Sequence, residues 1–203
     1  MYIVMNFRLA LLVVLALSVR PLAQVPKKPS PPSSKPVESA ETIYRNPTIG
    51  FRYRIPYGWV ERTKEMQEGD DAAKGEVLLA VFERPPQVSG DTINSAVVIA
   101  SLSASDYPGL KRAEDFLGTL TELTAAQGFK VDGDPSEALI DSQRLVRADF
   151  SKPRSDKLTM HQSTLVLLTK GQIVSFTFIA DSSDGVNDLI DGLGFSVQKS
   201  KAK

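Results

Sequence analysis

The stretch from Asn46 to Trp59 constrains the fold of this chain more than any other. Within it, apolar residues alternate with arginines in the order Phe51, Arg52, Tyr53, Arg54, Ile55. Such alternation is the period of a strand with one buried face and one solvated face. Pro56 has no amide hydrogen for a sheet ladder, so we expect the strand to end there. A turn at Tyr57 and Gly58 then returns Trp59, the single tryptophan, to the domain, where we expect it to be mostly buried.

A second β-rich region predicts a hairpin formed by residues 158–169 and 172–180 around Lys170 and Gly171. If Thr169 pairs with Gln172, one face of this hairpin carries Leu165, Leu167, Val174, Phe176 and Phe178. The opposite face then carries Met160, Val166, Leu168, Ile173 and Ile179. Both faces are apolar, so other elements must cover each of them.

Two segments with apolar residues at helical spacing, 110–127 and 184–193, are the candidates for that cover. Gly128 is expected to end the longer helix, and Asp181 or Ser182 to cap the shorter one. Gly118 lies inside the longer helix, where glycine costs about 1 kcal/mol relative to alanine, which suggests close packing there. The sequence therefore predicts an α+β fold, an antiparallel β-sheet flanked by helices on both faces.

The first strand and its turn also resemble those of a known family. The matching residues are Gly50, Phe51, Tyr53, Ile55, Pro56, Gly58 and Trp59, and a weaker match covers the Lys170-Gly171 hairpin, the short helix after it and Phe195. This pattern is similar to the PsbP-like family, named for an extrinsic protein of photosystem II and including many exported bacterial proteins. The resemblance spans about Ile43 to Val197. It implies an α/β/α sandwich, and it supplies no catalytic residue.

The beginning of the sequence predicts export. Residues 1–23 combine Arg8 with an apolar run from Leu9 to Val19 and small residues suited to cleavage, which is typical of a secretory signal peptide. The run is too short for a spanning helix, which needs about 20 residues. We expect a periplasmic or secreted protein, and the alternative is an uncleaved signal that holds the chain at the membrane.

The remaining sequence divides into three parts. Residues 24–40 are rich in proline, lysine and serine and carry almost no apolar side chain, so we expect a disordered linker. Residues 41–198 have the composition of a single folded α/β domain, and residues 199–203 form a basic tail.

Several kinds of chemistry are excluded by composition. The sequence has no cysteine and a single histidine, His161, which excludes thiol catalysis, cysteine zinc sites and a two-histidine metal site. It contains no glycine-rich phosphate loop. The formal net charge is zero, without the concentrated basic face that nucleic acid requires. We therefore expect no cofactor, no metal and no nucleic acid.

Two patterns remain as candidates for chemistry. A Ser-His-Asp triad built on His161 is possible in number, but no Gly-x-Ser-x-Gly motif accompanies it, so a structural or solvated histidine is the favoured interpretation. Calcium binding is the second candidate, because four acidic residues lie close together in the sequence at Asp181, Asp184, Asp188 and Asp191. Their spacing does not fit an EF-hand loop, and helix capping explains them better.

What remains favours a binding surface. The side chains of Arg52 and Arg54 are expected to face water beside Tyr57, and we expect these three residues to contact a partner. Arg62 and Lys64 extend the candidate basic patch, and Tyr53, Tyr57 and Trp59 are candidates for a pocket lining, although core packing is favoured for them. The sequence thus predicts a non-enzymatic binding or scaffold domain that contacts an unknown envelope protein. The alternatives are a hydrolase that uses carboxylates alone and a carrier of a small apolar ligand.

Overall fold

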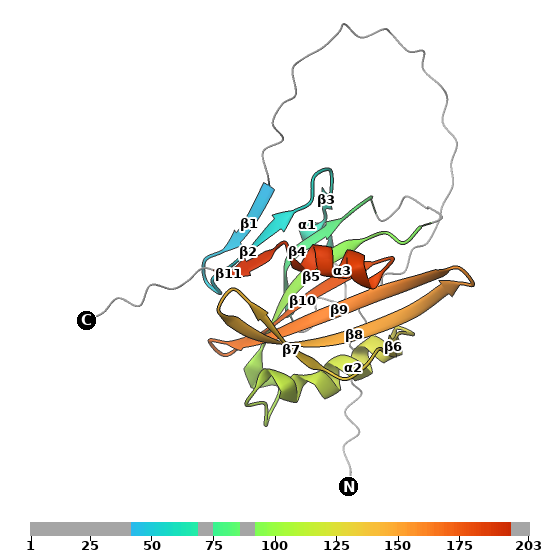
Figure 1. The fold of residues 1–203 in the computed structure, drawn as a ribbon. Helices are drawn as coiled ribbons and strands as arrows, with labels where there is room; N and C mark the ends of the chain where they lie inside the picture. Colours follow the sequence, from blue (N-terminus) through green and yellow to red (C-terminus); the bar gives the residue numbers. More distant parts are fainter. Residues whose placement is uncertain (1–41, 69–74, 86–91, 196–203) are drawn as a thin grey trace, which may run out of the picture.

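The computed structural model describes residues 42–68, 75–85 and 92–195 (Figure 1). The predicted signal peptide at 1–23, the linker at 24–40 and the basic tail at 199–203 lie outside these residues. Within the described ranges, no helix has the length and apolar content needed to cross a membrane.

A large antiparallel sheet forms the centre of the domain (Figure 1). Its strands follow the order β3-β4-β5-β10-β9-β8-β6, and β7 pairs with β8 beside β6. The strands are β3 (Val60–Glu61), β4 (Gly75–Phe82), β5 (Ala96–Ser103), β6 (Lys130–Val131), β7 (Ser136–Ile140), β8 (Gln143–Ser155), β9 (Leu158–Thr169) and β10 (Gln172–Ala180).

The register of the β9–β10 hairpin confirms the sequence prediction. Thr169 pairs with Gln172 across a turn in which both Lys170 and Gly171 have positive φ, at 49° and 75°. This register sends the two predicted sets of apolar side chains to opposite faces of the sheet, where all of them except Ile179 enter one of two separate hydrophobic clusters.

A second, small sheet contains the strand predicted from the opening motif. Strand β2 (Phe51–Ile55) lies between β1 (Thr42–Asn46) and β11 (Leu193–Phe195), and both pairings are antiparallel. Phe51 and Tyr53 are buried, Arg52 and Arg54 are exposed, and the strand ends before Pro56 as expected. The small sheet brings together segments from the two ends of the described chain.

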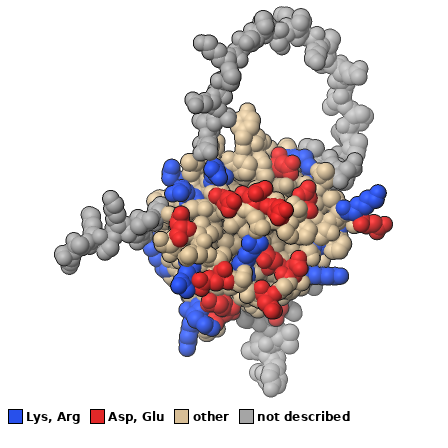
Figure 2. All heavy atoms as spheres, viewed as in Figure 1, with Lys and Arg blue, Asp and Glu red and all other residues tan. Residues whose placement is uncertain are grey.

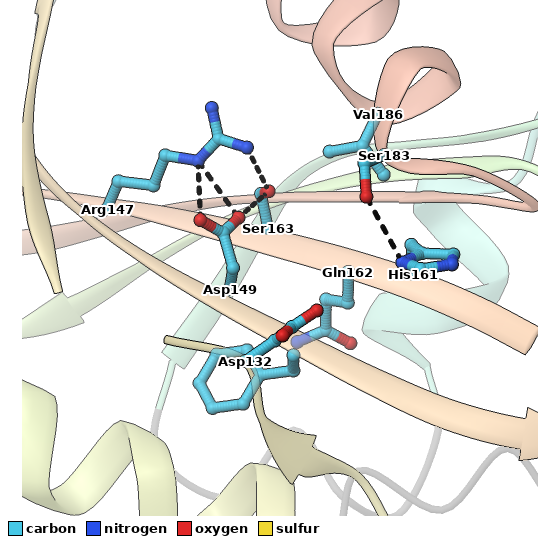
Figure 3. Close-up of a pocket in the computed structure, with 9 residues that line it drawn as sticks. Asp132, Arg147, Asp149, His161, Gln162, Ser163, Ser183 and Val186 are labelled. Carbon is cyan, nitrogen blue, oxygen red and sulfur yellow. Dashed lines mark hydrogen bonds and ion pairs between the residues drawn. The ribbon is translucent and has the colours of Figure 1, made fainter. Parts of the chain in front are cut away.

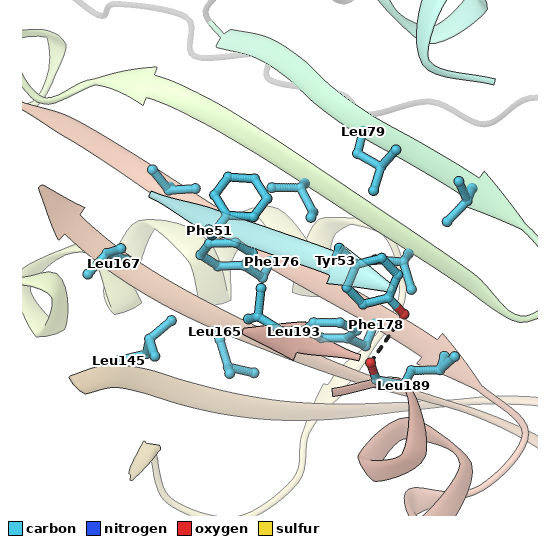
Figure 4. Packing of buried hydrophobic residues seen from close by; sticks show 14 of the residues in the cluster. Phe51, Tyr53, Leu79, Leu145, Leu165, Leu167, Phe176, Phe178, Leu189 and Leu193 are labelled. Atoms are coloured by element: carbon cyan, nitrogen blue, oxygen red, sulfur yellow. Dashed lines mark hydrogen bonds between the residues drawn. The ribbon is translucent and has the colours of Figure 1, made fainter. Parts of the chain in front are cut away.

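The first hydrophobic cluster lies between the small sheet and one face of the large sheet (Figure 4). Phe176 is at its centre, with edge-to-face ring contacts to Phe51 at 5.1 Å and to Phe195 at 5.9 Å between ring centroids. Helix α3 (Ser183–Ile190) packs at the side of this cluster through Val186 and Leu189. A helix was expected to help cover this face, and the small sheet covers it as well, so the predicted arrangement of helices flanking both faces is not confirmed.

The second cluster lies on the opposite face, under the 3₁₀ helix η2 (Ala113–Phe116) and helix α2 (Leu117–Ala126). The predicted helix 110–127 is therefore shorter than expected. Its start is displaced toward the C-terminus. The Asp115 carboxylate accepts hydrogen bonds from the amides of Lys111 and Arg112, both at 2.9 Å, and these bonds hold Arg112 in an extended conformation as the N-cap of η2. These bonds also lower the pKa of Asp115.

Of the two predictions made for glycines of this helix, one is confirmed and the other is wrong. Gly128 follows the C-terminal end of α2 with φ of 85°, as the sequence predicted. The close packing expected at Gly118 is wrong, since a Cβ added there would meet no atom within 4 Å.

Candidate functional site

The outer face of the small sheet is the first candidate site, and the strand register builds it. Arg45 lies opposite Arg52, and Ile43 lies opposite Arg54, so alternate residues of β1 and β2 share the face turned away from the core. All four side chains are exposed. We call the surface formed by Ile43, Arg45, Arg52 and Arg54, with Tyr57 in the following turn, the arginine face. In Figure 2, Lys and Arg atoms lie where Figure 1 places β1, and a band of acidic atoms lies over α3.

The position of Arg52 is set by Gly194 in the neighbouring strand β11. A Cβ added to Gly194 would lie only 3.0 Å from Nε and Nη2 of Arg52. The guanidinium group therefore lies close to the backbone of Gly194 in β11, and a larger residue at 194 would displace it. Among the described residues, neither Arg45 nor Arg52 has an acidic partner.

The other residues of the predicted basic patch do not share one environment. Arg62 directs Nη1 to Glu65 Oε1 at 2.7 Å, next to helix α1 (Thr63–Gln67). This hydrogen bond lowers the pKa of Glu65. Lys64 is exposed on the same short helix. Arg62 is thus engaged within its own segment and carries less weight than the arginines of β1 and β2.

The three aromatic residues that were candidates for a pocket lining lie in different environments. Tyr53 is fully buried and donates its hydroxyl hydrogen to the Leu189 carbonyl oxygen at 3.1 Å (Figure 4). Burial raises the pKa of this phenol well above its ordinary value, and the nearby charge of Arg54 opposes the rise. Trp59 is only partly buried at the edge of the first cluster, less than expected. Tyr57 is 87% exposed, so it is available for contact.

A polar pocket of about 210 Å³ is the second candidate site (Figure 3). It lies where β8 and β9 meet the first turn of α3. Its lining residues include the buried Phe150, Gln162, Ser163 and Val186, together with Asp132, Arg147, Asp149, His161 and Ser183. Drug-sized ligands usually occupy pockets of about 300–1,000 Å³, so only a small molecule would fit here.

One network of hydrogen bonds occupies the charged wall of this pocket (Figure 3). Arg147 Nε lies 2.9 and 3.0 Å from the two carboxylate oxygens of Asp149. Its Nη2 donates to Ser163 Oγ at 3.0 Å and its Nη1 to Asn187 Oδ1 at 3.0 Å, while Ser163 Oγ donates to Asp149. Both charges of this ion pair within β8 are therefore engaged, and their hydrogen bonds to Ser163 and Asn187 connect β8 to β9 and α3.

The histidine in this pocket does not form a catalytic triad. His161 Nδ1 is 3.4 Å from Ser183 Oγ, beyond the 2.6–3.2 Å that typically joins a nucleophile to its base. Among the described residues, no carboxylate hydrogen-bonds His161. Sequence spacing gave no reason to group His161 with Asp132, Arg147 and Ser183, because the sheet brings them together from four separate segments.

The N-cap of α3 is one of the two residues that the sequence predicted. Ser182 is the N-cap, and its Oγ accepts a hydrogen bond from the Gly185 amide at 3.1 Å. Asp184 lies in the first turn, where a negative charge is favourable. In the part of the chain that the structure describes, no group of three or more His, Cys, Asp or Glu residues is placed to hold a metal ion.

Comparison with known proteins gives a similarity of fold. No protein-family model matches the sequence, and no curated protein matches it. The solution structure of cyanobacterial PsbP, CyanoP, from Synechocystis sp. PCC 6803 is similar with a TM-score of 0.51 and 16% identity, covering 81% of this chain and 98% of CyanoP. The PsbP-like fold expected from the opening motif is thereby confirmed.

Two other solved structures are more remote. One is LpqN of Mycobacterium tuberculosis, described as involved in cell envelope biogenesis, with a TM-score of 0.43 and 16% identity over 79% of this chain and 87% of LpqN. The other is a protein of Bacteroides thetaiotaomicron, with a TM-score of 0.43 and 11% identity over 80% of this chain and 51% of that protein. At these TM-scores the likeness does not bear on function.

Proposed function

We propose that this chain is an exported, non-enzymatic binding or scaffold domain that acts through protein–protein contact in the cell envelope. The observation that carries the proposal is the arginine face. Its arginines and Tyr57 are exposed and take no part in the core, while the opposite side of the same strands is buried. Arginine and tyrosine are enriched in protein interfaces, where they supply both contact area and hydrogen bonds. Export rests on the signal-like residues 1–23.

The polar pocket favours the hydrolase alternative in one respect, because it holds two carboxylates, Asp132 and Asp149. Asp149, however, accepts three hydrogen bonds from Arg147 and Ser163, so its carboxylate oxygens are already engaged by neighbouring side chains. The carrier alternative is less well supported, because charged and polar side chains dominate the lining of this pocket.

Reversing two charges on the arginine face tests the proposal. Arg52→Glu with Arg54→Glu is expected to weaken retention of the native partner by tenfold or more, which corresponds to a loss of about 1.4 kcal/mol of binding free energy. Both side chains are exposed, so the melting temperature is expected to change little. Affinity pull-down from the native envelope fraction, quantified against the parent, measures the loss.

The matched control reverses two exposed charges in the β8–β9 loop region, Arg154→Glu with Lys157→Glu. This variant has the same change in net charge and is expected to retain the partner. Equal loss in both variants would show a nonspecific charge effect, and no loss in either would exclude the arginine face as the binding surface.

A further inference from the structure

We infer that the free edge of β1 accepts an extended, acidic segment of a partner protein as a fourth strand of the small sheet. This inference rests on the proposed function and names the partner chemistry and binding mode of the same surface. It follows from three features of β1: its open edge, the charge beside that edge, and the poor fit of other occupants.

The backbone of β1 is open on one side. In the order β1-β2-β11, β1 pairs with β2 alone among the described residues. None of its five residues is proline, so each carries an amide hydrogen and a carbonyl oxygen. In an antiparallel pair, alternate residues turn these groups away from the neighbouring strand, where another strand can bind them.

The remaining edges of the two sheets are shorter, already engaged or acidic. Strands β3 and β6, at the ends of the large sheet, have two residues each. On the far side of the small sheet, the Phe195 amide donates to Asp141 Oδ2 at 2.7 Å, so a side chain already satisfies β11 there. Strand β7 has five residues, but it carries the acidic Glu137. Strand β1 is the edge of useful length with basic side chains beside it.

The side chains next to this edge define the partner. An added strand would lie about 4.8 Å from β1, with alternate side chains beside Ile43 and Arg45. Aspartate or glutamate at these alternate positions would pair with Arg45, the basic side chain of β1 itself. The intervening side chains would turn toward Tyr44, which is partly buried against the first cluster, and should be apolar.

Other occupants fit less well. Two copies joined edge to edge through β1 would place the arginines of both on one sheet face, where like charges repel. Residues 24–40 of the chain itself contain five prolines and three lysines, so this segment has few amide donors and the wrong charge.

A synthetic peptide in which glutamate and valine alternate is the probe, tested with the full chain. Two further versions carry N-methyl groups on alternate amides, one on the odd positions and the other on the even positions. If the peptide adds as a strand, only one set of amides faces β1. We expect one methylated version to lose about tenfold or more in affinity, and the other to bind like the parent. Fluorescence anisotropy measures the three dissociation constants.

Amide hydrogen exchange locates the bound peptide. We expect slower exchange in β1 and unchanged exchange in β7. Equal affinity of the two methylated versions, equal binding of a lysine–valine peptide, or protection of β7 in place of β1 would each overturn the inference.

Two outcomes would identify a different occupant and also overturn it. One is β1 protection that rises with protein concentration without peptide, which indicates a second copy. The other is binding to phosphatidylglycerol vesicles with no response to the peptide, which indicates a lipid surface. If the peptide fails while Arg52→Glu with Arg54→Glu still releases the envelope partner, only strand addition is wrong. If the charge reversal has no effect, the proposed function itself fails.

Discussion

Replacing Phe176 by alanine is expected to lower the free energy of unfolding by about 3–5 kcal/mol, the usual range for truncating a buried aromatic side chain. Phe176 is fully buried in β10 and contacts Phe51 of β2 and Phe195 of β11 through ring edges. The substitution removes both contacts and leaves a cavity between the two sheets. Neighbouring side chains on the strands cannot collapse into that cavity without moving the small sheet.

Urea denaturation of the parent and variant measures this loss. Leu139→Ala is the control, because Leu139 is 65% exposed on β7 and its truncation should change stability by less than about 0.5 kcal/mol. A Phe176→Ala variant as stable as the Leu139→Ala variant would show that the small sheet does not depend on this contact.

Substitution of Gly192 by alanine is expected to destabilise the protein by about 1–3 kcal/mol, the typical effect of overpacking a well-packed site. Gly192 lies in the turn between α3 and β11. A Cβ there would come within 2.9 Å of the Tyr53 ring, 3.1 Å of the Arg54 carbonyl oxygen and 3.2 Å of the Leu189 carbonyl oxygen. Two of these atoms are backbone, and the Tyr53 ring is held by its bond to Leu189, so none yields easily.

Two other glycines give graded controls for this prediction. Gly118→Ala adds a methyl group in open space on α2 and is expected to stabilise the protein by up to about 1 kcal/mol. Gly194→Ala meets the flexible end of Arg52, which can swing away, so its effect should fall between the other two. Thermal melts should therefore give the highest melting temperature for Gly118→Ala and the lowest for Gly192→Ala. A Gly192→Ala variant that does not have the lowest melting temperature would contradict the packing described here.

The elements that the sequence predicted well are those with strong local patterns. The alternation from Phe51 to Ile55 placed one strand and both of its faces, and the turn at Lys170-Gly171 set the register of the β9–β10 hairpin. In each case the residues that determine the structure are adjacent in sequence. Helix α2 was placed correctly at its centre, while its start depended on the side chain of Asp115, whose capping role the helical pattern does not reveal.

The features that were missed depend on contacts between distant segments. Leu193 was assigned to a helix, although it begins β11 and pairs with Tyr53, some 140 residues earlier in the chain. The same pairing forms the small sheet that covers part of the core. The arginine face was predicted from Arg52, Arg54 and Tyr57, and the pairing of β1 with β2 added Ile43 and Arg45, because only the strand register shows that these residues share a face.

Site-specific photo-crosslinking in cells tests most directly whether the arginine face is the binding surface. A benzophenone amino acid is placed at Ile43 or Tyr57 on that face, and at Val131 or Leu139 as controls elsewhere on the surface. All four positions reach solvent, since Ile43 is 37%, Tyr57 87%, Val131 51% and Leu139 65% exposed. We predict a light-dependent adduct of one common partner from positions 43 and 57, absent at 131 and 139, and lost when Arg52→Glu and Arg54→Glu are added. Adducts from position 131 or 139 alone, or an adduct that survives the charge reversal, would contradict the account.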